Sequence, residues 1–335
     1  MTAFALPHRL EADAPPARRD AVRLLVAGRD GVEHARFTDF AEFLVPGDVV
    51  VVNTSGTLPA AVDGRRGDQL VTVHFAAALD DGSWVVEVRP PGRAAGPLDN
   101  VQAGDVITLP DAVQLRVLEP HPRDQRRLWR AGVDVEGDVV DYLSRHGRPI
   151  RYAYVPRPQP LAEYQTVFAR EPGSAEMPSA GRPFTDRLVT DLVTAGIGVA
   201  PITLHTGVSS PDAGEPPQAE RFRVPDATAR AVNMTRAWGG RVVAVGTTVT
   251  RALETAADGD GVVRAASGWT DVVLGADRPA RVVNGLVTGW HAPGASHLDL
   301  LRAVAGRELV DDAYDEALRA QYRWHEFGDS CLLLP

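Results

Sequence analysis

The most uniform hydrophobic run in the chain is Val-Val-Val-Val at 49–52, which follows a Pro-Gly-Asp turn. A short apolar run bounded by turn residues is typical of a strand buried on both faces of a sheet. Residues 242–254, VVAVGTTVTRALE, combine a similar run with a Gly-Thr-Thr turn and a helical pattern. Both segments predict α/β architecture, in which ligands bind in the loops after the carboxyl ends of strands.

The middle of the chain has a different period. Residues 70–90, LVTVHFAAALDDGSWVVEVRP, contain two alternating runs around Asp-Asp-Gly, which is a strong signal for a β-hairpin. Two further short runs of the same kind follow at 104–110 and 113–119. Helical periodicity is almost missing here, so this segment predicts a small β-barrel or sandwich.

Helical periodicity returns towards the C-terminus. In the segment DRLVTDLVTAG, apolar positions share one face, and Thr185 directly before it is the expected N-cap. In SHLDLLRAVAG, Ser296 and Asp299 have the spacing of a capping box. Both segments therefore predict helices.

Together these patterns predict the α/β fold class. Residues 1–60 and 150–335 are expected to form one discontinuous α/β domain, with a mixed sheet built from both chain ends and a ligand-binding role. Residues 61–149 are expected to form an inserted β-barrel domain. A length of 335 residues agrees with about two domains.

Charge and hydropathy narrow the function classes. The net charge of −9 argues against a large nucleic-acid partner, because such proteins usually carry a basic field. The basic clusters at 123–130 and 145–151 are interpreted as solvated surface. No apolar run reaches the ~18 residues of a membrane span, and the N-terminus lacks a signal-peptide pattern. We expect a cytoplasmic protein with no membrane partner.

Missing residue types exclude several chemistries. All 35 basic residues counted as Lys or Arg are arginine, which excludes Schiff-base catalysis and a P-loop because both need a lysine. The single cysteine, Cys331, cannot form an intrachain disulfide and is expected to be buried. His291 and His297 are six residues apart, which is no standard zinc spacing, so no metal site is expected.

Several polar residues could carry chemistry or could be structural. His205, at the end of the short strand in PITLHTG, is an acid–base group or a satisfied strand-end histidine. Thr247 and Thr248 are ligand-binding residues at a helix start, where free N–H groups favour an anion, or plain N-caps. Asp329 lies in a turn before the last strand, where a structural role is common. Spacing alone does not decide between these alternatives.

The loop PGSAEMPSAGRPFT, residues 172–185, consists largely of small residues and prolines and leads into a helix. It is interpreted either as a nucleoside-binding loop or as a structural turn. No nucleophile–base–orienter triad and no recognisable pair of acid–base carboxylates accompanies it.

Taken together, the motifs are far more specific than any one of them. The motifs are RDAVRLLV, FLVPGDVVVVN, EYQTVFA, GSAEMPSAGRPFT, TLHTG, GGRVVAVGTTVTRALET, GLVTGWHAPGASHLDLLRAVAG and YRWHEFGD. In order and spacing they resemble the S-adenosylmethionine:tRNA ribosyltransferase-isomerase family of queuosine biosynthesis, over nearly the whole chain.

The resemblance implies an α/β domain with an inserted β-barrel. It implies a transferase that takes the ribosyl group of S-adenosylmethionine and joins it to 7-aminomethyl-7-deazaguanine in tRNA. Adenine and methionine leave, and the sugar is isomerised to an epoxycyclopentanediol. S-adenosylmethionine is then a substrate, and neither a metal nor a second cofactor is needed.

The sequence departs from the family pattern at its polar motifs. The histidine of the family's Ala-Pro-Thr-Ala-Gly-Leu-His-Phe loop is replaced by Pro183, and its His-x-Met-His-x-Glu motif retains only Glu220. The Asn-Asp-Thr-Arg motif keeps only its asparagine at 53–56, and Gly-Thr-Phe is changed at 209–211. The Thr-Asn-Phe-His-Leu-Pro motif keeps His291. These losses cluster at the presumed site and favour a changed acceptor or changed chemistry.

We therefore expect an enzyme that uses S-adenosylmethionine as ribosyl donor, with His205, His291 and Glu220 as proton-handling residues. The family resemblance favours tRNA as the acceptor. The negative net charge and the lost motif residues favour a small-molecule amine. A lyase or a non-catalytic S-adenosylmethionine-binding protein are the alternatives. The predicted substrate-binding residues are Asn53, Tyr164, Gln165, Thr166, Ser179, Ala180, Gly181, Arg182, Gly246, Thr247, Thr248, Arg251 and Asp329.

Overall fold

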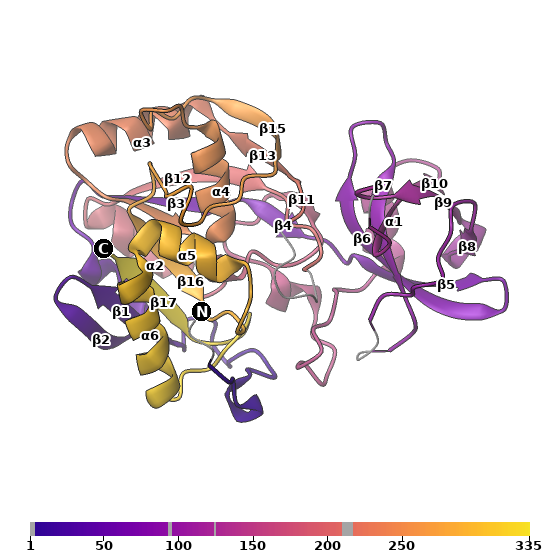
Figure 1. Cartoon of the computed structure of the whole chain (residues 1–335), viewed down its shortest axis with the longest axis horizontal. Helices are drawn as coiled ribbons and strands as arrows, with labels where there is room; N and C mark the ends of the chain where they lie inside the picture. Colours follow the sequence, from indigo (N-terminus) through magenta and orange to yellow (C-terminus); the bar gives the residue numbers. More distant parts are fainter. Residues whose placement is uncertain (1–3, 93–95, 124, 210–216) are drawn as a thin grey trace.

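The computed structural model describes residues 4–92, 96–123, 125–209 and 217–335, and it has two parts of unequal size (Figure 1). The larger part carries both chain termini, and the smaller part is a barrel. The predicted α/β fold class with an additional β-barrel is confirmed. The domain limits stay a prediction.

Within the described residues, nine strands form one mixed sheet in the order β15-β13-β12-β3-β14-β16-β17-β1-β2. Strand β3 pairs in parallel with β12 and β14, and β14 pairs in parallel with β16. Strand β17 pairs antiparallel with β16 and parallel with β1. These strands are β1 Arg23–Gly28, β2 Gly31–Arg36, β3 Val49–Asn53, β12 Gly198–Leu204, β13 Glu220–Val224, β14 Val242–Val245, β15 Ala266–Thr270, β16 Gly285–Gly289 and β17 Ser330–Leu334.

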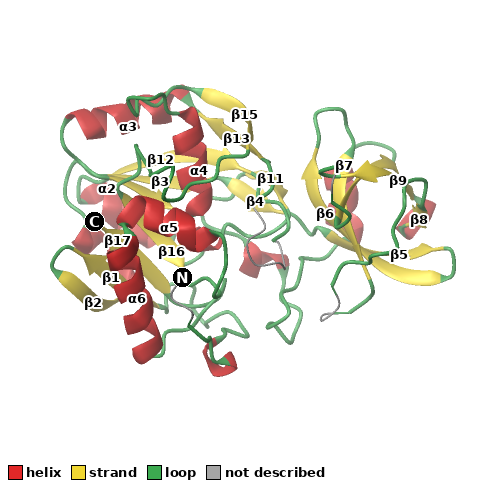
Figure 2. Cartoon of the chain, viewed as in Figure 1, coloured by secondary structure: helices red, strands yellow, loops and turns green. Residues whose placement is uncertain are grey.

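Helices cover both faces of this sheet (Figure 2). The helices of the larger part are α2 Asp186–Thr194, α3 Asp226–Ala237, α4 Thr247–Ala256, α5 His297–Ala305 and α6 Arg307–Arg319, with the 3₁₀ segments η1 His8–Leu10, η2 Phe37–Phe43, η4 Leu161–Tyr164 and η5 Ser179–Gly181.

The valine run of β3 contributes to the cores on both faces. Val49 and Val51 pack in the core that contains α3, α4, α5 and α6. Val50 and Val52 pack in the opposite core, with η2 and α2. Because side chains alternate along a strand, a central strand between two helical layers must be apolar at every position. This explains the uninterrupted run in the sequence.

The smaller part is a closed six-stranded barrel, in the order β10-β7-β6-β5-β8-β9. Strands β6 and β7 form the hairpin that the alternating pattern predicts. Helix α1, Val139–His146, packs Tyr142 and Leu143 into the barrel core. The strands are β5 Ala61–Arg66, β6 Gln69–Ala78, β7 Trp84–Arg89, β8 Val106–Thr108, β9 Gln114–Pro120 and β10 Leu128–Asp134, and η3 is Pro110–Ala112.

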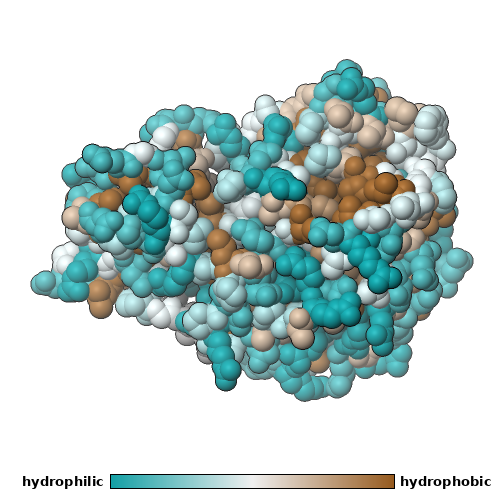
Figure 3. All heavy atoms as spheres, turned by 180° about the vertical axis from the view of Figure 1, so that it is seen from behind, coloured by the Kyte–Doolittle hydropathy of each residue, from teal (hydrophilic) through white to brown (hydrophobic). Residues whose placement is uncertain are grey.

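A two-stranded sheet of β4 (Ser55–Thr57) and β11 (Glu171–Ser174) lies between the two parts (Figure 1). Hydrophilic residues cover most of the surface seen from behind, and the largest hydrophobic area there lies on the larger part (Figure 3). Among the described helices, none has the length and apolar character needed to cross a bilayer.

Two predicted helix caps have different outcomes. Thr185 caps α2 as expected, because its hydroxyl accepts a hydrogen bond from the Leu188 N–H group at 3.2 Å. The capping box at Ser296 is wrong, since Ser296 has helical backbone angles and its side chain caps nothing. A side-chain cap needs an extended N-cap residue, and spacing alone does not reveal that conformation.

Candidate functional site

The larger of two described cavities has a volume of 250 Å³. It lies where the parallel strands β14 and β16 end, and it is also lined by residues after β12 and at the start of α5. The carboxyl edge of parallel strands is the usual binding side of an open α/β sheet. Of the predicted site residues, it brings together Ser179, Ala180, Glu220, Gly246, Thr247, Thr248, Arg251 and His291.

The start of helix α4 forms one wall. Its N-cap is Gly246, with φ +91°, and no side chain caps the helix. Thr247 and Thr248 are therefore the first helical residues rather than N-caps. A Cβ atom at Gly246 would lie 3.2 Å from the Ala180 side chain, so the small-residue loop packs directly on this turn. Uncapped N–H groups at a helix start favour an anionic ligand group.

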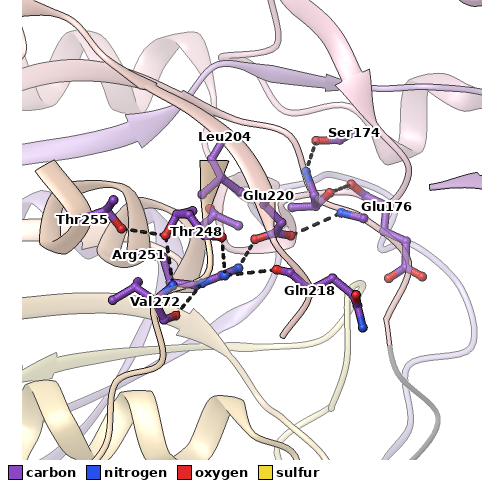
Figure 4. Close-up of polar contacts among 12 residues, drawn as sticks. Ser174, Glu176, Leu204, Gln218, Glu220, Thr248, Arg251, Thr255 and Val272 are labelled. Carbon is purple, nitrogen blue, oxygen red and sulfur yellow. Dashed lines mark hydrogen bonds and ion pairs between the residues drawn. The ribbon is translucent and has the colours of Figure 1, made fainter. Parts of the chain in front are cut away.

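Arg251 is held entirely by the protein (Figure 4). Its guanidinium forms an ion pair with Glu220 and donates hydrogen bonds to the carbonyl oxygens of Gln218 and Thr270, at 3.2 and 3.1 Å. Its Nε atom donates to the carbonyl of Val272 at 3.1 Å. Arg251 therefore fixes the position of Glu220 and of the segments around it.

Glu220 uses both of its carboxylate oxygens in the protein. Its Oε2 atom accepts from Arg251, and its Oε1 atom accepts from the Gly207 N–H group at 3.3 Å. Burial raises the pKa of Glu220 above its ordinary value, although the charge of Arg251 and the Gly207 hydrogen bond lower it. The carboxyl can bind a proton more readily than a solvated glutamate.

His291 stacks on His297, with 4.6 Å between ring centroids and 5° between planes. Its Nε2 atom lies 3.0 Å from the Thr288 hydroxyl, and its backbone N–H donates to the Tyr314 hydroxyl at 3.2 Å. Burial first, then the neighbouring His297 and His325, holds the pKa of His291 well below its usual value. A neutral imidazole can donate through one ring nitrogen and accept through the other.

Three further titratable residues of the cavity do not follow from the sequence motifs: Glu176, Glu326 and His297. Two are carboxyls: Glu176, whose oxygens accept from the N–H group and hydroxyl of Ser209, and Glu326, in the turn before β17. The sequence singles out His297 only through its spacing from His291, which does not suit zinc. A carboxyl beside aromatic residues, as in Trp-His-Glu-Phe, is the signal that could have identified Glu326.

The barrel contributes Arg127 to the cavity. Its side chain is only 9% exposed, which differs from the solvated surface interpreted for this basic cluster. Arg127 forms an ion pair with the buried Glu87 of β7 at 2.9 Å and donates to the Ser209 carbonyl at 3.4 Å. One arginine therefore connects the barrel to the loop after β12.

Several predicted binding residues lie outside the cavity lining and hold the scaffold. Gln165 accepts from the Thr57 N–H group at 2.9 Å and donates to its carbonyl at 2.8 Å, and the Tyr164 carbonyl accepts from the Thr57 hydroxyl. Arg182 is 2% exposed and pairs with Glu163 at 2.6 Å. Thr166 and Gly181 are buried side by side, because a Cβ atom on Gly181 would lie 3.3 Å from Thr166.

Asn53 and Asp329 are also engaged in the framework. The Asn53 side chain donates to the Leu204 carbonyl at 2.8 Å and accepts from the Leu204 N–H group at 3.0 Å, which joins the ends of β3 and β12. Asp329 pairs with Arg23 at 2.9 Å and accepts from the Arg323 N–H group at 2.7 Å. The structural alternative for the turn aspartate agrees with these contacts.

His205 lies in the smaller cavity, of 130 Å³, with Gly173, Arg221 and the barrel residue Trp84. Its Nδ1 atom is 2.7 Å from the Ser55 hydroxyl, and burial lowers its pKa. The structure therefore does not bring His205 into the cavity that contains His291 and Glu220. Its catalytic role stays a prediction.

Two of the motifs that differ from the family pattern lie partly outside the described residues. Residues 210–216 include Ser210 and Pro211 of one motif and Glu215 and Pro216 of the other. Within the described residues, no group of three or more histidine, cysteine, aspartate or glutamate side chains could hold a metal ion.

Comparison with known proteins identifies the family. The family model described as queuosine biosynthesis protein matches residues 2–333. The chain belongs to this family. The S-adenosylmethionine:tRNA ribosyltransferase-isomerases of Moorella thermoacetica and Symbiobacterium thermophilum are 38% and 36% identical to it, over 99% of this chain and 98% of each relative. The predicted resemblance is thereby confirmed.

A solved structure is also similar to this queuosine biosynthesis family member. The crystal structure of S-adenosylmethionine tRNA ribosyltransferase from Thermotoga maritima matches with a TM-score of 0.56 and 28% identity, and 99% of each chain is covered. The mixed sheet and the barrel thus belong to a fold already seen in this family.

Proposed function

We propose that this protein transfers and isomerises the ribosyl group of S-adenosylmethionine onto 7-aminomethyl-7-deazaguanine in tRNA, with release of adenine and methionine. The observation that carries the proposal is the gathering of eight predicted site residues around one 250 Å³ cavity in a member of the queuosine biosynthesis family. The relatives named above are described as enzymes of this reaction.

The cavity offers a place for each chemical part of the donor. The uncapped start of α4 suits the carboxylate of the methionine part. The carboxyls Glu176 and Glu326 suit the positive charges of S-adenosylmethionine and of an amine acceptor. The sulfonium acidifies the adjacent 5′ carbon, so a modest base can remove a proton there. Neutral His291 is in the form that can accept this proton, after which adenine leaves by elimination.

The identity of the acceptor can be tested directly. Family membership favours tRNA, whereas the net charge of −9 favours a small amine, since tRNA binding draws most of its affinity from basic side chains. Incubation with S-adenosylmethionine, with and without precursor tRNA, separates these cases when adenine and methionine are followed by mass spectrometry. Release that requires tRNA supports the proposal, and release without any acceptor indicates a lyase. No release in the presence of precursor tRNA contradicts the proposal.

We predict that His291→Ala lowers the rate of adenine release by at least about 100-fold, the size of a typical general acid–base contribution. The matched control is His8→Ala, since the His8 side chain is 98% exposed and lies outside the cavity. We expect His205→Ala to reduce the rate less than His291→Ala, because His205 lies in the smaller cavity. A fully active His291→Ala enzyme would show that the assignment is wrong.

A further inference from the structure

Glu326 lies in a tightly constrained turn between α6 and β17. The preceding residue, His325, has φ +73°, a conformation that is uncommon outside glycine. The His325 N–H group donates to the Trp290 carbonyl at 3.3 Å, and its carbonyl accepts from the Gly328 N–H group at 3.0 Å. A Cβ atom on Gly328 would lie 2.4 Å from the Arg323 carbonyl oxygen, so the turn requires glycine there.

Aromatic side chains brace the same turn. The His325 ring stacks on Tyr154 with 4.2 Å between centroids, and Tyr154 stacks on Tyr152 with 5.5 Å between centroids. Tyr152 and Glu326 both line the larger cavity. Strain held by surrounding structure is common at functional sites, where it fixes one side chain in a useful direction.

The Glu326 carboxyl has unused hydrogen-bonding capacity. Its Oε2 atom is buried and has no hydrogen-bond partner among the described residues. The other cavity-lining carboxyls differ: Glu220 accepts from Arg251 and Gly207, and both oxygens of Glu176 accept from Ser209. Because most buried polar atoms are satisfied, an oxygen that lines the cavity without a protein partner is available for a contact with a ligand.

We propose that Glu326 binds the acceptor amine in the larger cavity and removes the proton that keeps this amine from acting as a nucleophile. The inference rests on the proposed function, since it names the base for the acceptor side of that reaction. An alkylammonium is both a cation and a hydrogen-bond donor, which matches a carboxylate with a free buried oxygen.

The step is a single proton transfer. One N–H bond of the ammonium breaks, its electron pair stays on nitrogen, and an O–H bond forms on the Glu326 carboxylate. The products are a neutral amine, whose lone pair can attack the sugar, and a neutral carboxylic acid. No oxidation or reduction is involved, and the acid can return its proton to departing adenine or to water.

The burial of Glu326 assists this transfer. It raises the pKa of Glu326 to about 7, opposed only by its own backbone N–H group. An alkylammonium has a pKa of about 10, so the unfavourable gap shrinks from roughly six units to roughly three. The charged or titratable groups that face the same cavity are Arg127, Tyr152, Glu176, Glu220, Arg251, His291 and His297.

The test measures the rate of adenine release from pH 6 to 9.5 for the wild type and for the variants Glu326→Gln, Glu326→Asp and Glu42→Gln. S-adenosylmethionine and precursor tRNA are present at saturating concentrations when kcat is measured. Glu42 is exposed and lies outside the cavity, which makes Glu42→Gln the matched control. We expect Glu326→Gln to lower kcat by about 10²–10⁴-fold at pH 7. The acidic limb near pH 7 should be lost, while KM for S-adenosylmethionine changes little.

Two further readouts separate proton transfer from a structural role. The deficit of Glu326→Gln should shrink towards pH 9.5, where the ammonium loses its proton without help. Glu326→Asp should recover part of the rate and keep the acidic limb. If Glu326→Gln does not fold, the rate and the pH profile of Glu326→Asp, compared with those of the wild type, still test the proposal.

Failure of the two proposals can be told apart. A wild-type protein that releases no adenine contradicts the proposed function. An active wild type whose Glu326→Gln variant keeps the full kcat and the same acidic limb overturns the role of Glu326 alone. Glu326→Gln with an equal deficit at every pH also overturns it, since that result indicates a structural contribution.

Discussion

The variant Arg251→Met is expected to lower the free energy of unfolding by about 3–5 kcal/mol, the usual cost of removing one partner of a buried ion pair. The Arg251 side chain is 6% exposed and is the partner of Glu220. Methionine fills a similar volume but donates no hydrogen bond. Glu220 would lose its counter-charge, and three backbone carbonyls would lose a hydrogen bond from the guanidinium. Urea unfolding followed by circular dichroism measures the loss.

Two variants make this measurement specific. The double variant Arg251→Met/Glu220→Gln should recover part of the loss, because it removes the uncompensated carboxylate. Arg187→Met should change stability little, since Arg187 and Asp191 form an exposed ion pair on helix α2. A loss in Arg251→Met no larger than that in Arg187→Met would contradict the prediction.

The fold could be predicted from the sequence because its main signals are local. Four consecutive valines require a strand that is covered on both faces, and β3 is such a strand. Alternation around Asp-Asp-Gly specifies the hairpin of β6 and β7 without knowledge of the remainder of the barrel. These patterns depend on side chains only a few positions apart, where backbone geometry fixes their relative directions.

The site could be predicted only where it follows such a local pattern. Gly246, Thr247 and Thr248 lie at a strand-to-helix turn, and the structure places them at the cavity. His205 also follows a strand, yet it faces the smaller cavity. The local sequence does not specify which cavity a side chain at a strand end will face. That direction depends on the neighbouring strands and on the barrel.

The role of Glu326 could not be predicted from a local sequence pattern. In the segment Trp-His-Glu-Phe-Gly-Asp, the sequence draws attention to Asp329, which the structure uses to join β17 to Arg23 and Arg323. The neighbouring glutamate faces the cavity because of a positive φ at His325 and a close backbone contact at Gly328. The absence of a partner for a side-chain atom is a property of the whole described fold, so no short segment predicts it.

The second large effect expected is a pH-dependent gain in stability for Glu326→Gln. The pKa of Glu326 is about 7 in the folded protein, against an ordinary value of 4.5. Between these two values the folded state binds more protons than the unfolded state, so this group makes the wild type less stable as pH rises from about 4.5 to about 7. At 1.36 kcal/mol per unit, the ionised carboxylate costs about 3 kcal/mol above pH 7.

Glutamine cannot ionise and avoids that cost, so Glu326→Gln should exceed the wild type in stability by about 3 kcal/mol at pH 8 and match it below pH 4.5. Urea unfolding at several pH values measures the difference. Glu176, whose pKa burial also raises, is present in both proteins, and its contribution largely cancels. Glu42→Gln should follow the wild type throughout. A pH-independent difference for Glu326→Gln would show that Glu326 ionises normally in the folded protein, whereas the predicted curve would show a carboxyl kept at the cavity at the expense of stability.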